Sequence, residues 1–284
     1  MSARTTIVTV TYNSAAVVGQ MLRSLPTDAV VVVVDNASTD DTCARVEADL
    51  PPHGRLVAAL RNEGFGRACN RGAMGAETEF LLFLNPDARL EPGALEALEE
   101  EADRRPDLGA ANPSIETANG RARLKMTSVL PVERMPRPAP ETAGRMPVLS
   151  GGVLFVRRAA FEAVGGFDPA IFLYHEDHEL CWRLAQAGHE LWHLPQARAV
   201  HIMGTGTARS PEAARWKGFH MARSRYYVVE KATPGQGFRR SFWPALLSLL
   251  SPVNFLSNRR RQKSIGQISG AVSARKDGGV YRPQ

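Results

Sequence analysis

The first half of the chain alternates short apolar runs with longer stretches of mixed polarity. Unbroken apolar runs of this kind predict strands that are covered on both faces. These runs occupy residues 7–10, 30–34 and 80–84, with weaker ones at 56–60 and 108–111. The intervening stretches predict helices at 14–25, 38–50, around 69–73 and at 94–104. A repeated strand–helix alternation predicts an α/β fold with a mostly parallel central sheet flanked by helices.

The second half departs from this alternation before returning to it. Residues 117–147 hold five prolines and few apolar runs, which predicts an irregular loop. Regular structure is then expected as a strand over 150–156 and a helix over 158–164. A further helix should begin near residue 176, with short strands at 190–193 and 199–201. We therefore divide the chain into a domain spanning 1–214 and a tail spanning 215–284.

Composition narrows the class of protein further. The 284 residues are 44% hydrophobic, enough for a sizeable core. The three cysteines (Cys43, Cys69 and Cys181) are scattered and without CxxC spacing, which argues for a reducing compartment and against a disulfide framework. Residues 1–10 run directly into a strand and show no signal-peptide pattern. We expect a cytoplasmic protein, with the inner face of the cell membrane as an alternative location.

Charge is distributed unevenly along the chain. The tail, 215–284, contains 14 lysines and arginines against two acidic residues, a net charge of +12. Because the whole chain carries +6, residues 1–214 carry −6. The basic character therefore belongs to the tail alone.

The tail also contains an apolar segment, 239–255, interrupted by two prolines and bounded by arginines. It is too short to span a bilayer as a helix, but its pattern suits a membrane interface. Peripheral membrane contact through 239–263 is one interpretation; packing on the body or on a second copy in a homo-oligomer is the other. Residues after Gly266 are rich in Gly, Ser and charge, which predicts disorder. Aromatic residues do not interleave with basic ones, so no nucleic-acid partner is expected.

Polar residues follow three of the predicted strands. They are Tyr12 and Asn13, Asp35 and Asn36, and Asn85 and Asp87. Open α/β sheets bind ligands at the carboxyl ends of their strands. No GxGxxG motif follows the first strand, which argues against a standard dinucleotide site. Asp35 is a candidate for contact with a base or ribose, and its alternative is a cap of the next helix.

Two adjacent carboxylates, Glu176 and Asp177, open the helix that follows an aromatic run. Acidic residues suit a helix N-terminus because the unpaired amides and the dipole favour negative charge. One interpretation is therefore purely structural. The other is that one carboxylate faces a cleft and takes a proton from a substrate.

The chain resembles family 2 glycosyltransferases of the GT-A fold, in particular the bacterial rhamnosyltransferase-like branch. Nine short motifs carry the resemblance, and they occur in the order typical of the family over residues 5–230. They are 10–13 (VTYN), 34–40 (VDNASTD), 62–66 (NEGFG), 70–72 (NRG), 84–87 (LNPD), 150–152 (SGG), 164–168 (VGGFD), 174–183 (YHEDHELCWR) and 201–204 (HIMG).

The resemblance implies a donor site along the first strands of the sheet. The residues assigned to donor or nucleotide binding are Thr11, Tyr12, Asn13, Asp35, Asn62, Gly64, Arg67, Asn70, Asn85 and Asp87. Ser150, Gly151 and Gly152 would lie near the donor sugar and the acceptor. Arg67 and Arg71 are also candidates for phosphate contact, although solvated helix arginines are the commoner case.

The same resemblance implies a metal and a base. The family's Asp-x-Asp metal motif appears here as Asn85-Pro86-Asp87, so Asp87 is the expected ligand of Mg²⁺ or Mn²⁺, with His201 completing the site. One carboxylate is replaced by an amide. The general base is assigned to Asp177 in preference to Glu176, because the family places it at the aspartate. One base and one displacement imply inversion at the anomeric carbon.

The expected activity is transfer of a sugar in bacterial cell-surface polysaccharide synthesis. Branch resemblance favours dTDP-rhamnose as donor, with UDP- or GDP-sugars as alternatives, and a glycan or polyprenyl-diphosphate-linked acceptor. A rival interpretation is a non-catalytic nucleotide-sugar-binding or assembly module. The presence of Asp87 together with Glu176 and Asp177 argues against it.

Overall fold

In the computed structural model, which describes residues 3–117, 124–136, 140–201 and 210–282, one mixed sheet organises the first two thirds of the chain. The strands run in the order β3-β2-β1-β4-β8-β6-β9-β5, and β7 pairs with β9. Their bounds are β1 Thr5–Thr11, β2 Val30–Asp35, β3 Gly54–Ala58, β4 Phe80–Leu84, β5 Ala88–Leu90, β6 Leu108–Thr117, β7 Gly144–Arg145, β8 Val153–Arg157 and β9 Glu190–His201.

Parallel pairing joins β3, β2, β1 and β4, the half of the sheet built from strand–helix units, and also joins β6 to β9. β8 runs antiparallel between β4 and β6, and β5 and β7 pair antiparallel with β9. The predicted α/β fold is confirmed. The two short strands expected at 190–193 and 199–201 are one continuous strand, with a register shift near its middle.

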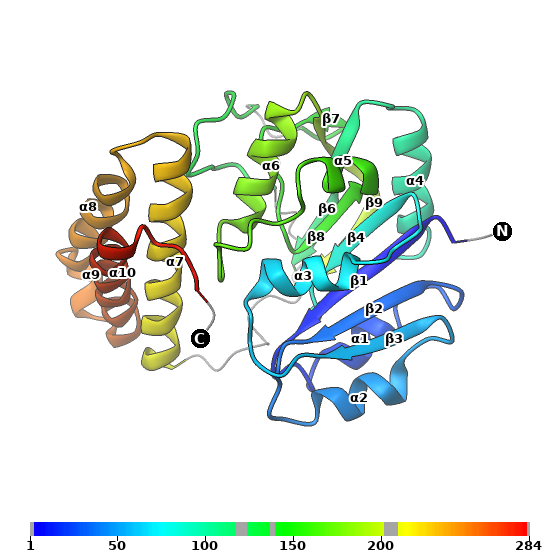
Figure 1. Cartoon of the computed structure of the whole chain (residues 1–284), viewed down its shortest axis with the longest axis horizontal. Coiled ribbons are helices and arrows are strands. Elements are labelled where there is room, and N and C mark those ends of the chain that lie inside the picture. The colour runs from blue at the N-terminus through cyan, green and yellow to red at the C-terminus, as the bar shows by residue number, and fades with distance from the viewer. Residues whose placement is uncertain (1–2, 118–123, 137–139, 202–209, 283–284) are drawn as a thin grey trace.

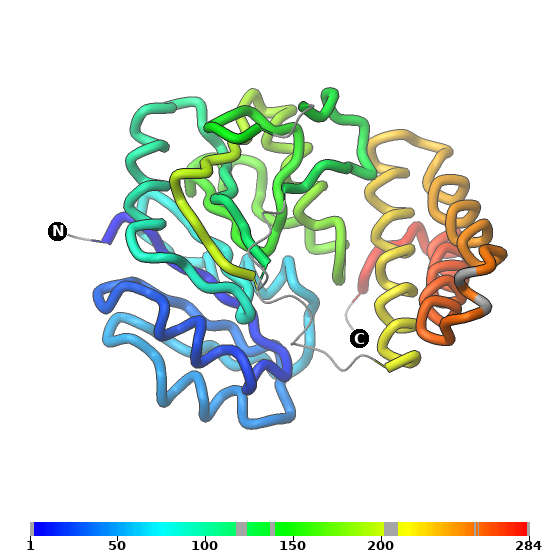
Figure 2. Tube along the Cα trace, turned by 180° about the vertical axis from the view of Figure 1, so that it is seen from behind, coloured from blue at the N-terminus to red at the C-terminus, as the bar shows by residue number. Residues whose placement is uncertain are grey.

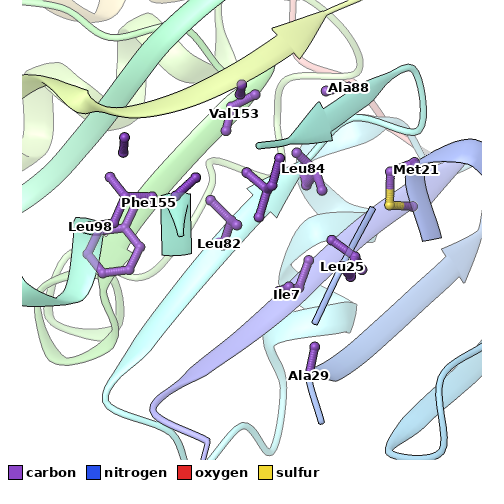
Figure 3. Close-up of a cluster of buried hydrophobic side chains, with 14 of the residues drawn as sticks. Ile7, Met21, Leu25, Ala29, Leu82, Leu84, Ala88, Leu98, Val153 and Phe155 are labelled. Carbon is purple, nitrogen blue, oxygen red and sulfur yellow. The ribbon is translucent and has the colours of Figure 1, made fainter. Parts of the chain in front are cut away.

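Helices cover both faces of the sheet (Figure 1). α1 Val18–Leu22, α2 Thr42–Asp49 and α4 Ala94–Asp103 pack on one face, and α3 Phe65–Ala73, α5 Arg158–Ala163 and α6 Glu176–Gln186 pack on the other. Alternate strand residues enter the two cores: Ile7 joins the first and Val8 the second. Figure 3 shows part of the first core, where Leu82, Leu84 and Phe155 lie together. Burial on both faces is why the strands read as unbroken apolar runs.

The C-terminal quarter forms a group of helices beside the sheet (Figures 1 and 2). The group consists of α7 Pro211–Ala232, α8 Gly237–Leu249, α9 Pro252–Phe255 and α10 Asn258–Asp277. The prediction of disorder after Gly266 is wrong, because α10 continues to Asp277 and ends at Gly278, which has φ 74°. The expected division at 214 and 215 lies inside α7 and stays a prediction.

Glycines bring α7 and α10 into direct backbone contact. A Cβ added to Gly266 would lie 2.0 Å from the carbonyl oxygen of Arg215, and one added to Gly270 would lie 2.2 Å from that of Phe219. Such distances are incompatible with any side chain, so glycines one turn apart let the two helices touch. Gly266 and Gly270, whose presence contributes to the prediction of disorder, instead allow α10 to pack closely against α7.

α7 also attaches the helical group to the sheet domain. Val228 and Val229 of α7 share a small buried cluster with Leu130 and Ile171. The Lys231 ammonium lies 2.6 Å from Asp168 Oδ2 and 2.7 Å from Glu179 Oε1. Helical group and sheet domain therefore pack together around the segment that precedes α6.

The predicted loop over 117–147 is irregular where the structure describes it, apart from the end of β6 and the two residues of β7. Within the described ranges, no helix is long and apolar enough to cross a membrane.

Candidate active site

The two adjacent carboxylates occupy the first turn of α6. Tyr174 and His175, immediately before them, both have positive φ, 71° and 67°. This uncommon backbone turns the chain sharply into the helix. Asp177 then lies beside Gly151, just before β8, and Glu176 and Asp177 are each only 9% exposed. The structural interpretation of this pair as a helix start is therefore correct, and it does not exclude chemistry.

Asp177 is held as a charged group by three contacts. The ammonium of Lys125 forms an ion pair with Oδ2, the amide of Gly151 donates to Oδ2 at 3.0 Å, and the amide of His178 donates to Oδ1 at 2.8 Å. Burial acts to raise the pKa of Asp177. The nearby positive charge of Lys125 and the hydrogen bonds outweigh burial and hold that pKa well below its usual range.

Glu176 has the opposite environment. It faces α3, where its Cβ lies 3.9 Å from the position a Cβ would take on Gly66, and its Oε2 is buried without a hydrogen-bond partner among the described residues. Burial and the neighbouring charge of Asp177 raise the pKa of Glu176 to about 8. Near neutral pH the pair therefore carries one negative charge, on Asp177.

Two histidines flank the carboxylates and are neutral at pH 7. Burial lowers the pKa of His175 to about 3 and that of His178 to about 4. Nδ1 of His178 accepts a hydrogen bond from the amide of Val129 at 3.3 Å, and the Ser128 hydroxyl lies 3.2 Å from the same nitrogen. These contacts fasten the segment that carries Lys125 to α6.

A second polar cluster lies where β4 and β9 end. Nε2 of His201 lies 2.8 Å from Oδ1 of Asp87, which is hydrogen-bond distance. The amide of Asn85 donates to the carbonyl of Gly152 at 2.9 Å, which places the Asn85 turn beside the same glycine. Lys217 of α7 is near enough for Asp87 to raise its pKa, although burial and Arg259 lower that pKa overall.

Ser150, Gly151 and Gly152 join the two clusters. A Cβ on Gly151 would lie 3.1 Å from the Asp177 Cβ, whereas one on Gly152 would lie 3.0 Å from Cε1 of His201. Adjacent residues thus face the Asp177 cluster and the Asp87–His201 cluster, and consecutive Cα atoms are about 3.8 Å apart. The amide of Ser150 donates to Asn112 Oδ1 at 2.6 Å, which fixes the glycine pair in place.

Asp87 and His201 fit a divalent cation of the kind that also takes oxygen ligands from a bound diphosphate. Mg²⁺ is commonly held by one or two carboxylates together with substrate phosphates and water, and Asp87 would supply that carboxylate. The parts of the chain that the structure describes contain no group of three or more His, Cys, Asp or Glu side chains able to hold a metal. Two side chains on the protein side leave most of the coordination to substrate and water.

The donor-site candidates at the ends of β1 and β2 lie in two loops that are hydrogen-bonded to each other. Asp35 is 2% exposed, and its carboxylate accepts from the Thr11 hydroxyl at 2.9 Å and from the Ser38 amide at 2.9 Å. The side chain of Asn13, which has φ 51°, accepts from the amide of Thr39 at 2.8 Å. Tyr12 is 47% exposed at the same edge, leaving its ring free for a flat ligand.

Asn62 and Gly64 belong to a neighbouring loop. Asn36 donates to the Asn62 side chain at 2.9 Å, and that side chain also accepts from the amide of Gly64 at 3.0 Å. Gly64 has φ 89°, and a Cβ there would lie 2.3 Å from the carbonyl oxygen of Phe172. Only glycine allows this loop to touch the segment leading into α6.

Arg67, Asn70 and Arg71 are turned toward protein partners. Nε of Arg67 donates to the carbonyl of Pro169 at 2.8 Å, and Arg71 pairs with Glu63 at 2.5 Å. Asn70 both donates to the carbonyl of Phe167 and accepts from its amide, at 2.8 and 2.9 Å. Arg67 and Asn70 tie α3 to the segment before α6, whereas Arg71 ties it to the loop that contains Glu63. Contact of the three side chains with a donor stays a prediction.

Lys125 is the site residue that sequence patterns missed. It lies in the proline-rich segment without regular structure, and its partner is 52 positions away. Residues 202–204 of the last motif lie outside the described residues, so only its first member, His201, is placed.

Comparison with known proteins shows which family models and relatives match this chain. The model described as glycosyl transferase family 2 matches residues 6–165, and one described as the N-terminal domain of galactosyltransferase matches 138–204. An N-acetylglucosaminyl-diphospho-decaprenol L-rhamnosyltransferase of Mycobacterium tuberculosis H37Rv is 32% identical over 247 residues. That alignment covers 72% of this chain and 78% of the relative.

Solved structures agree on the fold. Residues 1–349 of Staphylococcus aureus TarS superpose with a TM-score of 0.60 at 17% identity, covering 99% of this chain and 93% of that one. A crystal structure of GalNAc-T7 with UDP, GalNAc and Mn²⁺ has a TM-score of 0.60 at 17% identity, covering 95% of this chain and 56% of that one. At these identities the likeness concerns the fold alone.

The opposed environments of the carboxylates predict a pH dependence of stability. Unfolded Glu176 is ionised above about pH 5, whereas folded Glu176 keeps its proton up to about pH 8. The free energy of unfolding should therefore fall as pH rises, with a slope from this group of up to about 1.4 kcal/mol per pH unit. His175 and His178 bind protons in the unfolded state near pH 6.5 and add an opposite slope, which fades as the pH rises toward 8 and is shared by wild type and Glu176 variants.

Urea unfolding at several pH values between 6.5 and 8 measures this slope. Glu176→Gln should lose the Glu176 contribution, so that its slope is more positive than that of wild type, because glutamine does not titrate. The exposed α4 variant Glu96→Gln should keep the wild-type slope. Equal slopes in wild type and Glu176→Gln would show that Glu176 is not protonated in the folded protein.

Proposed function

Because the chain belongs to glycosyltransferase family 2, we propose that it is an inverting enzyme that transfers rhamnose from dTDP-rhamnose to a polyprenyl-diphosphate-linked glycan acceptor. UDP- and GDP-sugars are the alternative donors. The observation that carries the proposal is the pair of clusters on either side of Gly151 and Gly152, one with a charged carboxylate and one with Asp87 and His201. The name of the mycobacterial relative supports the choice of rhamnose and of a polyprenyl-linked acceptor.

The reaction needs a base on one side of the sugar and charge neutralisation on the other. The acceptor hydroxyl attacks the anomeric carbon, its proton passes to Asp177, and the bond from that carbon to the diphosphate oxygen breaks. Attack opposite the leaving group inverts the anomeric centre. Gly151 and Gly152 present backbone where side chains would otherwise fill the space for the sugar.

The donor's nucleoside would lie along the ends of β1 and β2, against the exposed ring of Tyr12. Asp35 would act mainly through the loop that it holds, since its carboxylate already accepts from Thr11 and Ser38. Asp87 and His201, with Asn85 adjacent, would hold Mg²⁺ or Mn²⁺. A bound cation would offset the negative charge that develops on the diphosphate as it leaves.

Lys125 must separate from Asp177 before proton transfer. A carboxylate paired with an ammonium has little affinity for a proton, and a general base works best when its pKa is near the working pH. Binding of the acceptor hydroxyl between the two groups would replace the ion pair by a hydrogen bond and raise the pKa of Asp177. Burial, which already acts in that direction, would then dominate.

Asp177→Asn should retain the fold and lose sugar transfer by about 10²-fold or more, the effect of removing a general base. Initial rates with dTDP-rhamnose and a GlcNAc-diphospho-polyprenol acceptor measure the loss, and circular dichroism melts check folding. Asp107→Asn, at an exposed carboxylate on the far end of the sheet, is the matched control. Wild-type-like turnover in Asp177→Asn would reject this residue as the base.

Removal of divalent cations should abolish transfer, and added Mg²⁺ or Mn²⁺ should restore it. Asp87→Asn should raise the metal concentration needed for half-maximal rate by about tenfold or more, since it removes the charged ligand. The neighbouring exposed variant Glu91→Gln should titrate like wild type. Undiminished transfer in the presence of excess chelator would contradict the role given to Asp87 and His201.

The outer face of α8 fits an anionic membrane surface. Trp243, Leu247 and Leu250 are 53%, 68% and 64% exposed. Their spacing of four and three residues puts them on one face of α8 and its C-cap, with exposed Arg239 one turn before Trp243. An apolar stripe beside arginines is the pattern of helices that lie in the interface of an anionic bilayer. Such contact would bring the enzyme to an acceptor anchored in lipid.

Flotation with vesicles containing anionic lipid tests this contact. The wild-type chain should float with the vesicles, and Trp243→Ser combined with Leu247→Ser should reduce the floated fraction severalfold, because each buried apolar side chain contributes about 1.5–3 kcal/mol. Val272→Ser, at an exposed apolar position on α10, is the control. Equal flotation of all three proteins would reject α8 as the contact.

A further inference from the structure

The C-terminal helices line a cavity of about 540 Å³, open to solvent on one side, to which the sheet domain contributes only His175 among the described residues. α7 contributes Arg225, α8 contributes Ser241, and α10 contributes Arg260 and Lys263. The volume lies within the range of about 300–1,000 Å³ that small-molecule sites occupy.

The lining of this cavity is strongly basic. It includes the side chains of Arg225, Arg260 and Lys263 and no acidic residue. None of these three forms an ion pair with any residue in the described ranges, whose charged side chains elsewhere pair frequently. Desolvation, followed by the charge of Arg240, lowers the pKa of Arg225, as expected of a cation held without a counter-charge.

Buried polar atoms at the cavity also lack partners within the described chain. They are Nε of Arg225, Oγ of Ser241 and Nε2 of His175. Ser241 is only 4% exposed. An unsatisfied buried polar group costs about 1–3 kcal/mol. The Nε–H of Arg225 and the hydroxyl of Ser241 are donors, so these two groups at one basic cavity indicate a ligand that supplies acceptor oxygens.

The cavity lies between the proposed membrane face and the proposed base. Pro244 and Ser248 of α8 line it, next to Trp243 and Leu247 on the outer face of the same helix. His175, which also lines the cavity, directly precedes Glu176 and Asp177 of α6. A molecule that carries a lipid chain, then an anionic group and then a sugar would match the outer face of α8, the basic cavity and the carboxylates of α6 in that order.

We propose that this cavity binds the diphosphate of the acceptor, with Arg225 and Lys263 as its main cationic contacts. The assignment to an acceptor rests on the proposed function. The donor's diphosphate has its own place near Asp87 and His201, so the two anionic groups of the reaction would lie on opposite sides of the transferred sugar.

Two acceptors distinguish this role from a general effect on catalysis. One is a GlcNAc-diphospho-polyprenol, and the other is an alkyl GlcNAc glycoside that lacks phosphate. Lys263→Gln and Arg225→Gln should raise the KM for the diphosphate acceptor about tenfold or more, the effect of losing a charge-assisted hydrogen bond. The KM for the alkyl glycoside and the KM for the donor should not change. Lys276→Gln, at an exposed lysine near the end of α10, should match wild type with both acceptors.

Equal changes in KM for both acceptors, or no change with either, would overturn the proposal. Lys263 is exposed, so its variant keeps the test valid if Arg225→Gln fails to fold.

Binding of inorganic pyrophosphate, measured by calorimetry with UDP or dTDP saturating the donor site, tests the cavity without any transfer. Wild type and Lys276→Gln should bind it, and Lys263→Gln should bind at least tenfold more weakly. Such binding without transfer to either acceptor would refute the proposed function and leave an anion site with another ligand. Equal binding of pyrophosphate by wild type and Lys263→Gln would refute the cavity as an anion site, whatever the enzyme transfers.

Discussion

A carboxylate that is nine-tenths buried needs compensating partners, and Asp177 takes them from segments far apart in the sequence. Lys125 comes from the irregular segment after β6, and the amide of Gly151 comes from the turn before β8. Burial, followed by the charge on Asp177, raises the pKa of the neighbouring Glu176, so the two adjacent carboxylates do not both ionise near neutral pH. The buried charge on Asp177 therefore holds Lys125 of the irregular segment and the Gly151 turn in place, and it helps to keep Glu176 protonated.

A buried carboxylate cannot be both a stable charge and a strong base at the same time. The ion pair with Lys125 favours the stable charge, and its loss would favour the base. Paired with Lys125, Asp177 is stable in the closed site but weakly basic. Without Lys125, the same burial that now opposes its charge would make it a competent base. In the proposed function, the acceptor hydroxyl is the group that comes between them. Transfer to water would then be disfavoured, since the proposed base would gain strength only when an acceptor has displaced the lysine.

The strand–helix half of the fold could be predicted from sequence because both faces of each strand are buried. Val31 and Val32 enter opposite cores, so the run at 30–34 is apolar throughout. Lys125 could not be predicted, since no local pattern marks a lysine whose partner lies 52 residues away. Disorder after Gly266 was a compositional inference, and composition does not register that Gly266 and Gly270 share one face of a helix. Their contact with α7 depends on spacing.

The helices after residue 210 complete the site, and they do so through the segment that enters α6. The ring of Phe172 packs against those of Trp216, His220 and Tyr281, at centroid distances of 4.6 to 6.0 Å. The Ser224 hydroxyl donates to the carbonyl of Leu173 at 2.8 Å. Positive φ at the next two residues needs such support from outside, because the local backbone does not favour it. The same helices that would meet the lipid therefore also hold the turn that presents Asp177, and this contact would link the proposed acceptor site mechanically to the proposed base.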